Sequence, residues 1–129
     1  MFKTIATIAF LVLAGAAQAV AQDAPIKRTP LQRYDVPGTN LEYVMAMAEI
    51  VPNVLIGKHT HPGVEAGYVV SGELTLLVDG QPPLALKAGD SFKITGVATV
   101  HDAKSGPNGA KVLAIYVVEK GKPLATAAK

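Results

Sequence analysis

The chain of 129 residues contains no cysteine. Without a thiol it can form no disulfide, use no cysteine nucleophile and carry no lipid on an N-terminal cysteine. A small domain that lacks disulfides must be held together by core packing, by a partner subunit or by a bound metal. Histidine is nearly as scarce, with only three in the whole chain, so the position of each one is informative.

The chain also has no large excess of positive or negative charge. The sequence has 12 lysines and arginines against 10 aspartates and glutamates, and Lys3 lies in a segment that we expect to be removed. The remaining lysines are spread along the C-terminal part rather than gathered in a stripe. A chain with so little net charge is expected to bind neither nucleic acid nor, once mature, a membrane.

A short apolar run lies near the N-terminus. Lys3 precedes the apolar residues 4–14, and small residues follow at 17–21, which is the pattern of a secretory signal peptide and its cleavage site. The run is shorter than the ~18 residues that a membrane-spanning helix needs, so an uncleaved anchor is the less favoured alternative. We therefore predict that residues 1–22 form a signal peptide and that the protein is exported, to the periplasm or outside the cell.

Helical periodicity is missing from the rest of the chain. Residues 23–40 are polar and contain three prolines, and they are expected to form an extended N-terminal segment. From Leu41 onward, short apolar runs are interrupted at close intervals by turn residues, as in half-buried strands. Strands are predicted near residues 41–50, 54–61, 65–71, 73–79, 83–87, 91–95, 98–103 and 110–119. The prediction is an all-β, single-domain barrel or sandwich over residues 41–119, with about eight short antiparallel strands and a C-terminal tail at 120–129.

Three short motifs predict where the chain reverses direction. Asp79-Gly80 and Asn108-Gly109 tolerate the positive φ angles of tight hairpins. Val51-Pro52-Asn53-Val54 suits a type II turn, with proline at the second position and asparagine at the third.

Two of the three histidines occupy alternate positions of a predicted strand. Side chains two residues apart on a strand face the same side, so His59 and His61 can share one target. Glu65 follows a turn at Pro62-Gly63 and can return beside them by antiparallel pairing. Neutral imidazoles and a carboxylate suit a divalent transition metal such as iron, manganese, nickel, zinc or copper. The alternative is that both histidines face solvent on an edge strand and that Glu65 only balances charge.

The segment HTHPGVEAGYVVSG, with the spacing His59-x-His61-x3-Glu65-x6-Gly72, resembles the first signature of the cupin superfamily. The resemblance extends over residues 41–119. It implies a single-domain cupin fold, a small jelly-roll β-barrel, in which the two histidines and the glutamate bind a metal.

The second cupin signature is poorly kept in GDSFKITGVATVHDAKS. Gly89 fits, but His101 comes one residue late. The resemblance implies that His101 is a fourth metal ligand, which requires a bulge or a longer turn near Gly96, because a one-residue shift otherwise moves a side chain to the other face. The alternative is a surface histidine beside Asp102. Asn53 replaces the glycine that usually opens the first signature, and asparagine also visits the left-handed region.

Several large side chains are candidates for the wall of such a barrel. Met45, Met47, Phe92 and Tyr116 are interpreted as barrel lining rather than as a cofactor site, and in a cupin they would also shape the substrate pocket. Tyr68 is expected to point away from the ligands, because side chains alternate along an unbulged strand.

The resemblance implies a metal-binding enzyme. Three or four protein ligands leave coordination positions open, where a small polar molecule could react by dioxygenase, isomerase or lyase chemistry. Glu65 is the one candidate for a catalytic base. Two alternatives stay open: a non-catalytic module that binds a small ligand or a metal ion, and a metal that only stabilises the barrel.

Short edge strands and the proline-bearing segment at 23–40 also predict a homodimer. In many cupin dimers such a segment lies across the partner's sheet, and the same arrangement is expected here. The expected partners are therefore a second copy of the chain and a small-molecule substrate or ligand.

Overall fold

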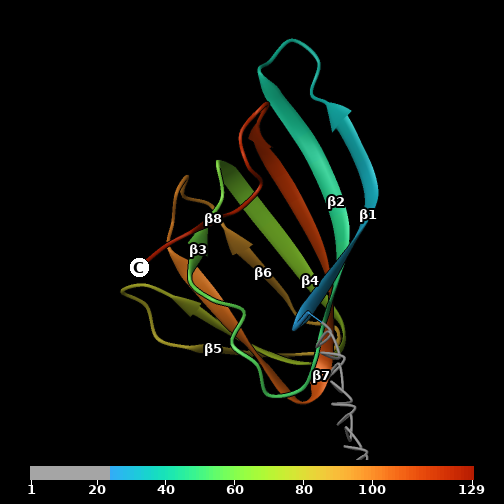
Figure 1. Ribbon diagram of the computed structural model, residues 1–129, viewed down its shortest axis with the longest axis vertical. Coiled ribbons are helices and arrows are strands. Elements are labelled where there is room, and N and C mark those ends of the chain that lie inside the picture. The colour runs from blue at the N-terminus through green and yellow to red at the C-terminus, as the bar shows by residue number, and fades with distance from the viewer. Residues whose placement is uncertain (1–23) are drawn as a thin grey trace, which may run out of the picture.

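The structure, a computed structural model, describes residues 24–129 (Figure 1). The predicted signal peptide at 1–22 lies outside these residues. Within them the regular elements are the strands β1 (Ile26–Asp35), β2 (Leu41–Ile50), β3 (His59–Thr60), β4 (Gly63–Val78), β5 (Leu84–Lys87), β6 (Ser91–Ile94), β7 (His101–Glu119) and β8 (Thr126–Ala127). The all-β prediction is confirmed. In this part of the chain, no helix is long and apolar enough to cross a membrane.

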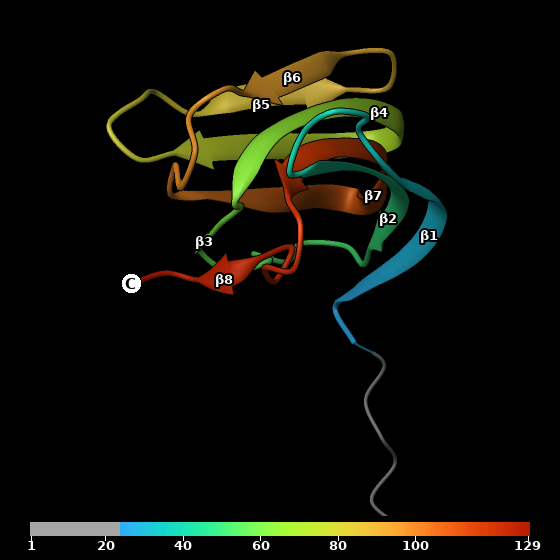
Figure 2. The same cartoon turned by 90° about the horizontal axis from the view of Figure 1, so that it is seen from above.

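Two long antiparallel strands, β4 and β7, organise the sheet. β2 pairs with the C-terminal half of β7, and β1 pairs with β2. β6 pairs with the N-terminal half of β4, and β5 pairs with its C-terminal half. β3 joins the beginning of β7, and β8 pairs with β3. Figure 2 shows the resulting curled sheet, with β5 and β6 on one side and β3 and β8 on the other.

The β4–β7 ribbon bends sharply near its middle. The pairing shifts register on both sides of Gly72, and residues 106–109 of β7 form a wide bulge there. Gly72 and Gly109 have positive φ angles of 75° and 74°, and a Cβ on Gly72 would lie 2.1 Å from the Gly109 carbonyl oxygen. Glycine alone allows two backbones to approach so closely in this conformation, so this glycine pair makes the bend possible.

The bend brings distant parts of the ribbon together. Glu65 pairs with Tyr116, and Val78 pairs with His101, so Glu65 and His101 would be about 40 Å apart on a straight ribbon. In the structure the Glu65 Oε2 and His101 Nε2 atoms are 3.2 Å apart. The two halves of the ribbon therefore face each other across the interior.

Two pairs of predicted strands are single strands in the structure. The segments expected at 65–71 and 73–79 belong to β4, and those expected at 98–103 and 110–119 belong to β7. Asn108-Gly109, predicted as a hairpin turn, lies in the bulge of β7. That prediction is wrong because a bulge accommodates a glycine with positive φ as well as a turn does, and the local sequence does not distinguish them.

The other two turn predictions are confirmed. Asp79-Gly80 connects β4 to β5, and Gly80 has a φ angle of 78°. Asn53 has a φ angle of 58°, which is the positive angle that the third position of a type II turn requires. The strand predicted at 54–61 is regular only at β3, and before it the chain pairs through an isolated bridge at Leu55.

The sheet extends beyond residues 41–119 at both ends. Part of the segment at 23–40 forms β1, which pairs with β2 of its own chain, and the C-terminal segment at 120–129 contains β8. β1 is exposed along nearly all of its length, so it lacks the apolar alternation of a half-buried strand. Pro30 is tolerated because β1 lies at an edge of the sheet.

Alternate residues of the strands build the interior. The buried residues of β2 are Glu42, Val44, Ala46, Ala48 and Ile50. Met45 and Met47 therefore lie on the outer face, and the expectation that they line the barrel is wrong. Both sets of β2 side chains are mostly apolar, and each contains one glutamate, so the pattern could not identify the inner face. Phe92 packs against the core and Tyr116 is buried, as predicted.

The close backbone contact at Gly72 predicts that a glycine-to-alanine substitution there lowers stability much more than the same substitution at Gly80. Gly72→Ala places a Cβ against a backbone oxygen and also strains φ, so the free energy of unfolding should fall by about 3 kcal/mol or more. Gly80→Ala should cost only about 1 kcal/mol, because a Cβ there meets nothing within 4 Å. Urea unfolding of both variants measures the difference, and equal losses would contradict the importance of this contact.

Candidate metal centre

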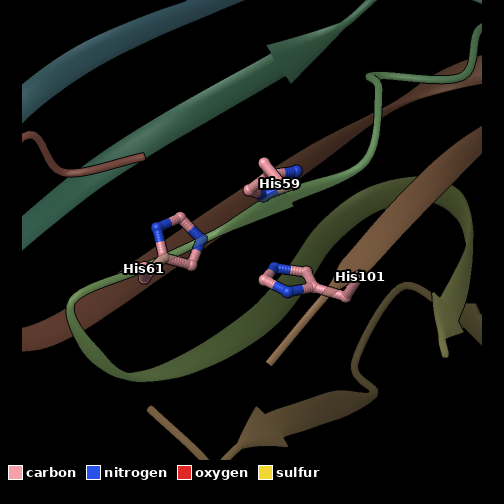
Figure 3. Close-up of side chains that lie close together, drawn as sticks. All are labelled: His59, His61 and His101. Atoms are coloured by element: carbon pink, nitrogen blue, oxygen red, sulfur yellow. The ribbon is translucent and has the colours of Figure 1, made fainter. Parts of the chain in front are cut away.

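All three histidines meet in the interior, with their rings turned toward one another (Figure 3). His59 lies on β3 and pairs directly with His101, the first residue of β7. His61 follows at the end of β3, before the chain enters β4. Their ligand nitrogens all lie within 4.8 Å of one another. Three histidines are thus positioned to bind one metal ion.

The histidines are not surface residues. His61 and His101 are 5% and 3% exposed, and His59 is half-buried. This burial excludes both a pair of solvent-facing histidines and a surface histidine beside Asp102. Asp102 is itself buried and accepts hydrogen bonds from backbone N–H groups, including that of Gly57 at 3.0 Å.

A longer turn before β7 explains how His101 joins the cluster although it comes one residue late. Residues 95–100 form no strand, and Ala98 has a φ angle of 56°, which few residues other than glycine adopt. The Ala98 N–H donates to the His61 carbonyl at 3.1 Å, so the turn is tied to the site. The longer turn expected near Gly96 is therefore present.

Each histidine ring is held through Nδ1 by a backbone carbonyl. The pairs are His59 with Gly57 at 2.8 Å, His61 with Leu124 at 2.6 Å and His101 with Thr99 at 2.9 Å. A carbonyl oxygen can only accept, so the proton of each neutral ring is on Nδ1 and a lone pair remains on Nε2. Hydrogen bonds of this kind orient imidazole for a metal.

A carboxylate completes the cluster from β4. Glu65 Oε2 lies 3.2 Å from Nε2 of His61 and 3.2 Å from Nε2 of His101. These three atoms are buried and have no hydrogen-bond partner among the described residues. Nitrogen lone pairs repel a carboxylate oxygen, and a buried polar group without a partner costs about 1–3 kcal/mol. A cation between these atoms removes both penalties, so the donor set fits a divalent metal.

The charges in the cluster depend on its mutual contacts. Burial alone would raise the pKa of Glu65, but the His101 and His61 imidazoles, when protonated, donate to it and attract its charge, which outweighs burial and lowers the pKa to about 2. Burial lowers the pKa of His59, and the two neighbouring imidazoles add to this effect. Burial would also lower the pKa of His101, but Glu65 outweighs it and raises the pKa. At neutral pH Glu65 is therefore an anion, and protons compete with a metal most strongly at His101.

Sequence reasoning missed the contribution of the C-terminal segment. β8 pairs with β3, with Ala127 opposite His59, and the Leu124 carbonyl just before β8 holds His61. No motif in residues 120–129 marks this role, because the contact is made by a backbone oxygen that every residue type carries. It follows from the tertiary structure alone.

A cavity of about 40 Å³ adjoins the histidines. His59, Glu65 and His101 lie in its wall, and most of the remaining wall is apolar. Within residues 24–129, the other polar side chains of the wall are those of Arg28 and Tyr116. An apolar cavity with a few convergent polar groups is typical of small-molecule sites.

Tyr116 faces the cluster from β7. Its ring centroid is 4.8 Å from that of His61, and it lies opposite Glu65 in the ladder. Burial raises the pKa of its hydroxyl and Glu65 raises it further, while Arg28 acts in the opposite direction. The hydroxyl therefore keeps its proton at neutral pH and is a donor within the site. Tyr68 is 47% exposed and points away from the site, as predicted.

Ligand protonation predicts how metal binding depends on pH. Imidazole binds a metal only when neutral, and the raised pKa of His101 means that protons compete there above the ordinary value of 6.5. A metal that binds only the native state raises stability by about 2.7 kcal/mol at a hundredfold excess over Kd. The gain in Tm on adding zinc should therefore be large near pH 8 and shrink steadily towards roughly pH 5.

Two variants control this measurement. His59→Ala should show little gain at either pH, because it removes a ligand. Glu49→Gln removes a carboxylate from an exposed position of β2 and should keep the whole gain. A gain that is equal at both pH values, or that survives in His59→Ala, would place the metal elsewhere.

Known proteins resemble the chain mainly in fold. No curated protein matches it in sequence. DMSP lyase DddQ from Ruegeria pomeroyi is 16% identical, with a TM-score of 0.68 and an alignment covering 92% of this chain and 59% of that one. A conserved uncharacterized protein with a double-stranded β-helix domain from Klebsiella pneumoniae is 21% identical, with a TM-score of 0.64 and coverage of 84% and 88%. The polyketide cyclase RemF from Streptomyces resistomycificus is 20% identical, with a TM-score of 0.62 and coverage of 81% and 72%.

The family itself is identified from the sequence. The model of the cupin domain matches residues 46–119, which is more than half of the chain and includes all three histidines and Glu65. The similar solved structures show the same fold at low identity. The chain belongs to the cupin family.

Proposed function

We propose that this cupin is a metal-dependent enzyme that acts on a small polar molecule, with His59, His61, His101 and Glu65 holding one divalent transition metal. The observation that carries the proposal is the set of buried donor atoms without partners beside a mostly apolar cavity. Iron, manganese, nickel, zinc and copper all accept such ligands. A metal of this kind supplies a Lewis acid, which stabilises negative charge on a bound hydroxyl or enol oxygen.

The two polar groups nearest the cluster suit different roles. Glu65, with a pKa of about 2, is ionised but is a weak base, and a general base works best when its pKa is near the operating pH. We therefore assign Glu65 to the metal rather than to proton transfer. Tyr116 keeps its proton because its pKa is raised, so it can donate a hydrogen bond to an oxygen of the substrate.

The proposed chemistry is of the dioxygenase, isomerase or lyase type. Where such a reaction passes through an enolate or alkoxide, negative charge develops on a substrate oxygen, which a bound metal and the Tyr116 hydroxyl would stabilise. Two of the structures with a similar fold are named as a lyase and a cyclase. Their names support the range of reaction classes and not a particular substrate, because they share only 16% and 20% of their residues with this chain.

A second candidate is a non-catalytic module that binds a small ligand or the metal ion itself. The size of the cavity favours it, because about 40 Å³ accommodates only a few water-sized groups. Such a module would retain metal and show no turnover. Export, which is expected from residues 1–22, is part of both candidates.

Metal content and turnover together test the proposal. Recombinant residues 23–129 should retain close to one divalent metal per chain, and the loaded protein should convert at least one of a panel of small keto-enol compounds. The double variant His59→Ala, His61→Ala should lose both properties, because it removes two ligands. Glu49→Gln should keep both. Protein that neither holds metal nor takes up iron, manganese, nickel or zinc would contradict the site, and metal without turnover would favour the binding module.

We also propose that the protein is a homodimer that buries the outer face of its sheet. Outward side chains of adjacent strands form one apolar surface there, made of Tyr34, Tyr43, Met45, Met47, Val64, Tyr68, Leu113, Ile115 and Val117. Tyr34 is 52% exposed although it stacks on Tyr43. Contiguous exposed apolar surfaces of this kind mark interaction sites.

A second copy is the favoured occupant because the centre of this surface is apolar and ion pairs lie near both of its ends. Lys111 pairs with Glu49 near one end, and Lys120 pairs with Asp35 near the other. Two copies can therefore meet through the apolar centre of this face, as a self-complementary two-fold interface allows. Since β1 already pairs with β2 of its own chain, the proposed contact uses this face.

Light scattering should find a dimer of the mature chain. Tyr68→Glu should dissociate it, because the substitution places a charge within the apolar surface. Leu84→Glu, at an exposed apolar position of β5 outside that surface, should leave the dimer intact. A wild-type monomer would contradict the homodimer.

A further inference from the structure

We propose that the cavity binds a small carboxylate whose head group lies between Arg28 and the metal centre. The inference rests on the proposed function, because it requires a metal at the histidine cluster. It concerns the one lysine or arginine that lines the cavity in the described part of the chain.

Arg28 projects from β1 toward the inner face of the sheet. It pairs with Ala48 of β2, and directly opposed residues on neighbouring strands place their side chains on the same face. Ala48 belongs to the buried core, so Arg28 points inward and lines the cavity together with His59 and Glu65. Arg28 as a whole is exposed, which places it at the open edge of the cavity.

Arg28 has no acidic partner of its own. The other arginine of β1, Arg33, also faces inward, opposite the buried Val44, and forms two hydrogen bonds to Glu42. Within residues 24–129, no carboxylate forms an ion pair with Arg28. Of the two arginines on the inner face of β1, Arg33 is therefore paired with a carboxylate, and Arg28 is not paired with any carboxylate of residues 24–129.

The charge balance of the cavity favours an anion. A divalent metal would bring two positive charges, and Arg28 adds a third. The three imidazoles are neutral and Glu65 supplies only one negative charge, so positive charge is in excess. A bound monoanion reduces this excess. A carboxylate also matches the planar fork of a guanidinium group, and its oxygens are donors that these metals accept.

Tyr116 supports the same head group. Tyr116 lines the same cavity as Arg28 and Glu65, and its ring centroid is 4.8 Å from that of His61. It can donate a hydrogen bond to a carboxylate that Arg28 holds. Arg28 and Tyr116 are therefore two polar groups of one cavity that can bind the same carboxylate.

The apolar part of the cavity wall limits which chemical groups can be attached to the carboxylate. Away from the charged groups the cavity is lined by apolar side chains, among them Ile26, Ile56 and Phe92. Burying a second polar group against this wall would leave it without a hydrogen-bond partner. The volume of about 40 Å³ limits the tail to a few carbon atoms, so the ligand class is a short-chain monocarboxylate.

Calorimetric titration of zinc-loaded protein with butyrate tests the inference without a turnover assay. Butyrate should bind, and its uncharged analogue butyramide should bind at least about tenfold more weakly, because a hydrogen bond to a charged group is lost. Arg28→Gln should weaken butyrate by a similar factor and leave butyramide unchanged, and Arg28→Lys should fall between. Lys27→Gln removes a positive charge one residue away, on the outer face of β1 opposite Glu49, and should leave butyrate affinity unchanged.

The outcomes separate this inference from the proposed function. Equal butyrate affinity in wild type and Arg28→Gln, or equal affinity for butyrate and butyramide, would overturn the role of Arg28. Retained zinc with no butyrate binding would overturn the carboxylate class and leave the metal site in place. Protein that takes up no zinc would overturn both.

Discussion

The bent pairing of β4 with β7 is the constraint on which the rest of the molecule depends. The other strands attach to this ribbon directly or through a neighbour. Its fold-over at Gly72 and Gly109 turns a separation of about 40 Å along a straight ribbon into a contact of 3.2 Å between Glu65 and His101. The metal ligands are thus brought together by the close backbone contact between Gly72 and Gly109, although neither glycine is a ligand.

The donor atoms are held in place by the protein before any metal binds. Three carbonyls from separate loops orient the three imidazoles, and one of them, that of Leu124, comes from the C-terminal segment. The cost of this arrangement is a set of buried atoms without partners, which the packed core around Val69 and Leu76 must offset. A chain without disulfides gains most from a metal that relieves this cost, since binding energy at a native site adds to the free energy of folding.

Local sequence patterns predicted the parts of the site that lie within a few residues of each other. The alternation of His59 and His61 and the turn before Glu65 are short-range features, and the structure places all three side chains together. The positive φ of Asn53 was predictable for the same reason. His101 was predictable only through the family resemblance, because its position depends on the length of the turn at residues 95–100.

The sequence by itself determined the class of the fold, the turn at Asp79-Gly80 and the three histidines available as ligands. These follow from side-chain alternation, from backbone preferences and from the scarcity of histidine, all of which act within a few residues. The tertiary structure alone decided which face of β2 is buried, that Asn108-Gly109 is a bulge, and that Arg28 and the Leu124 carbonyl reach the site. The physical reason is that these outcomes depend on strand register, which is determined by packing summed over the whole sheet rather than by any one segment.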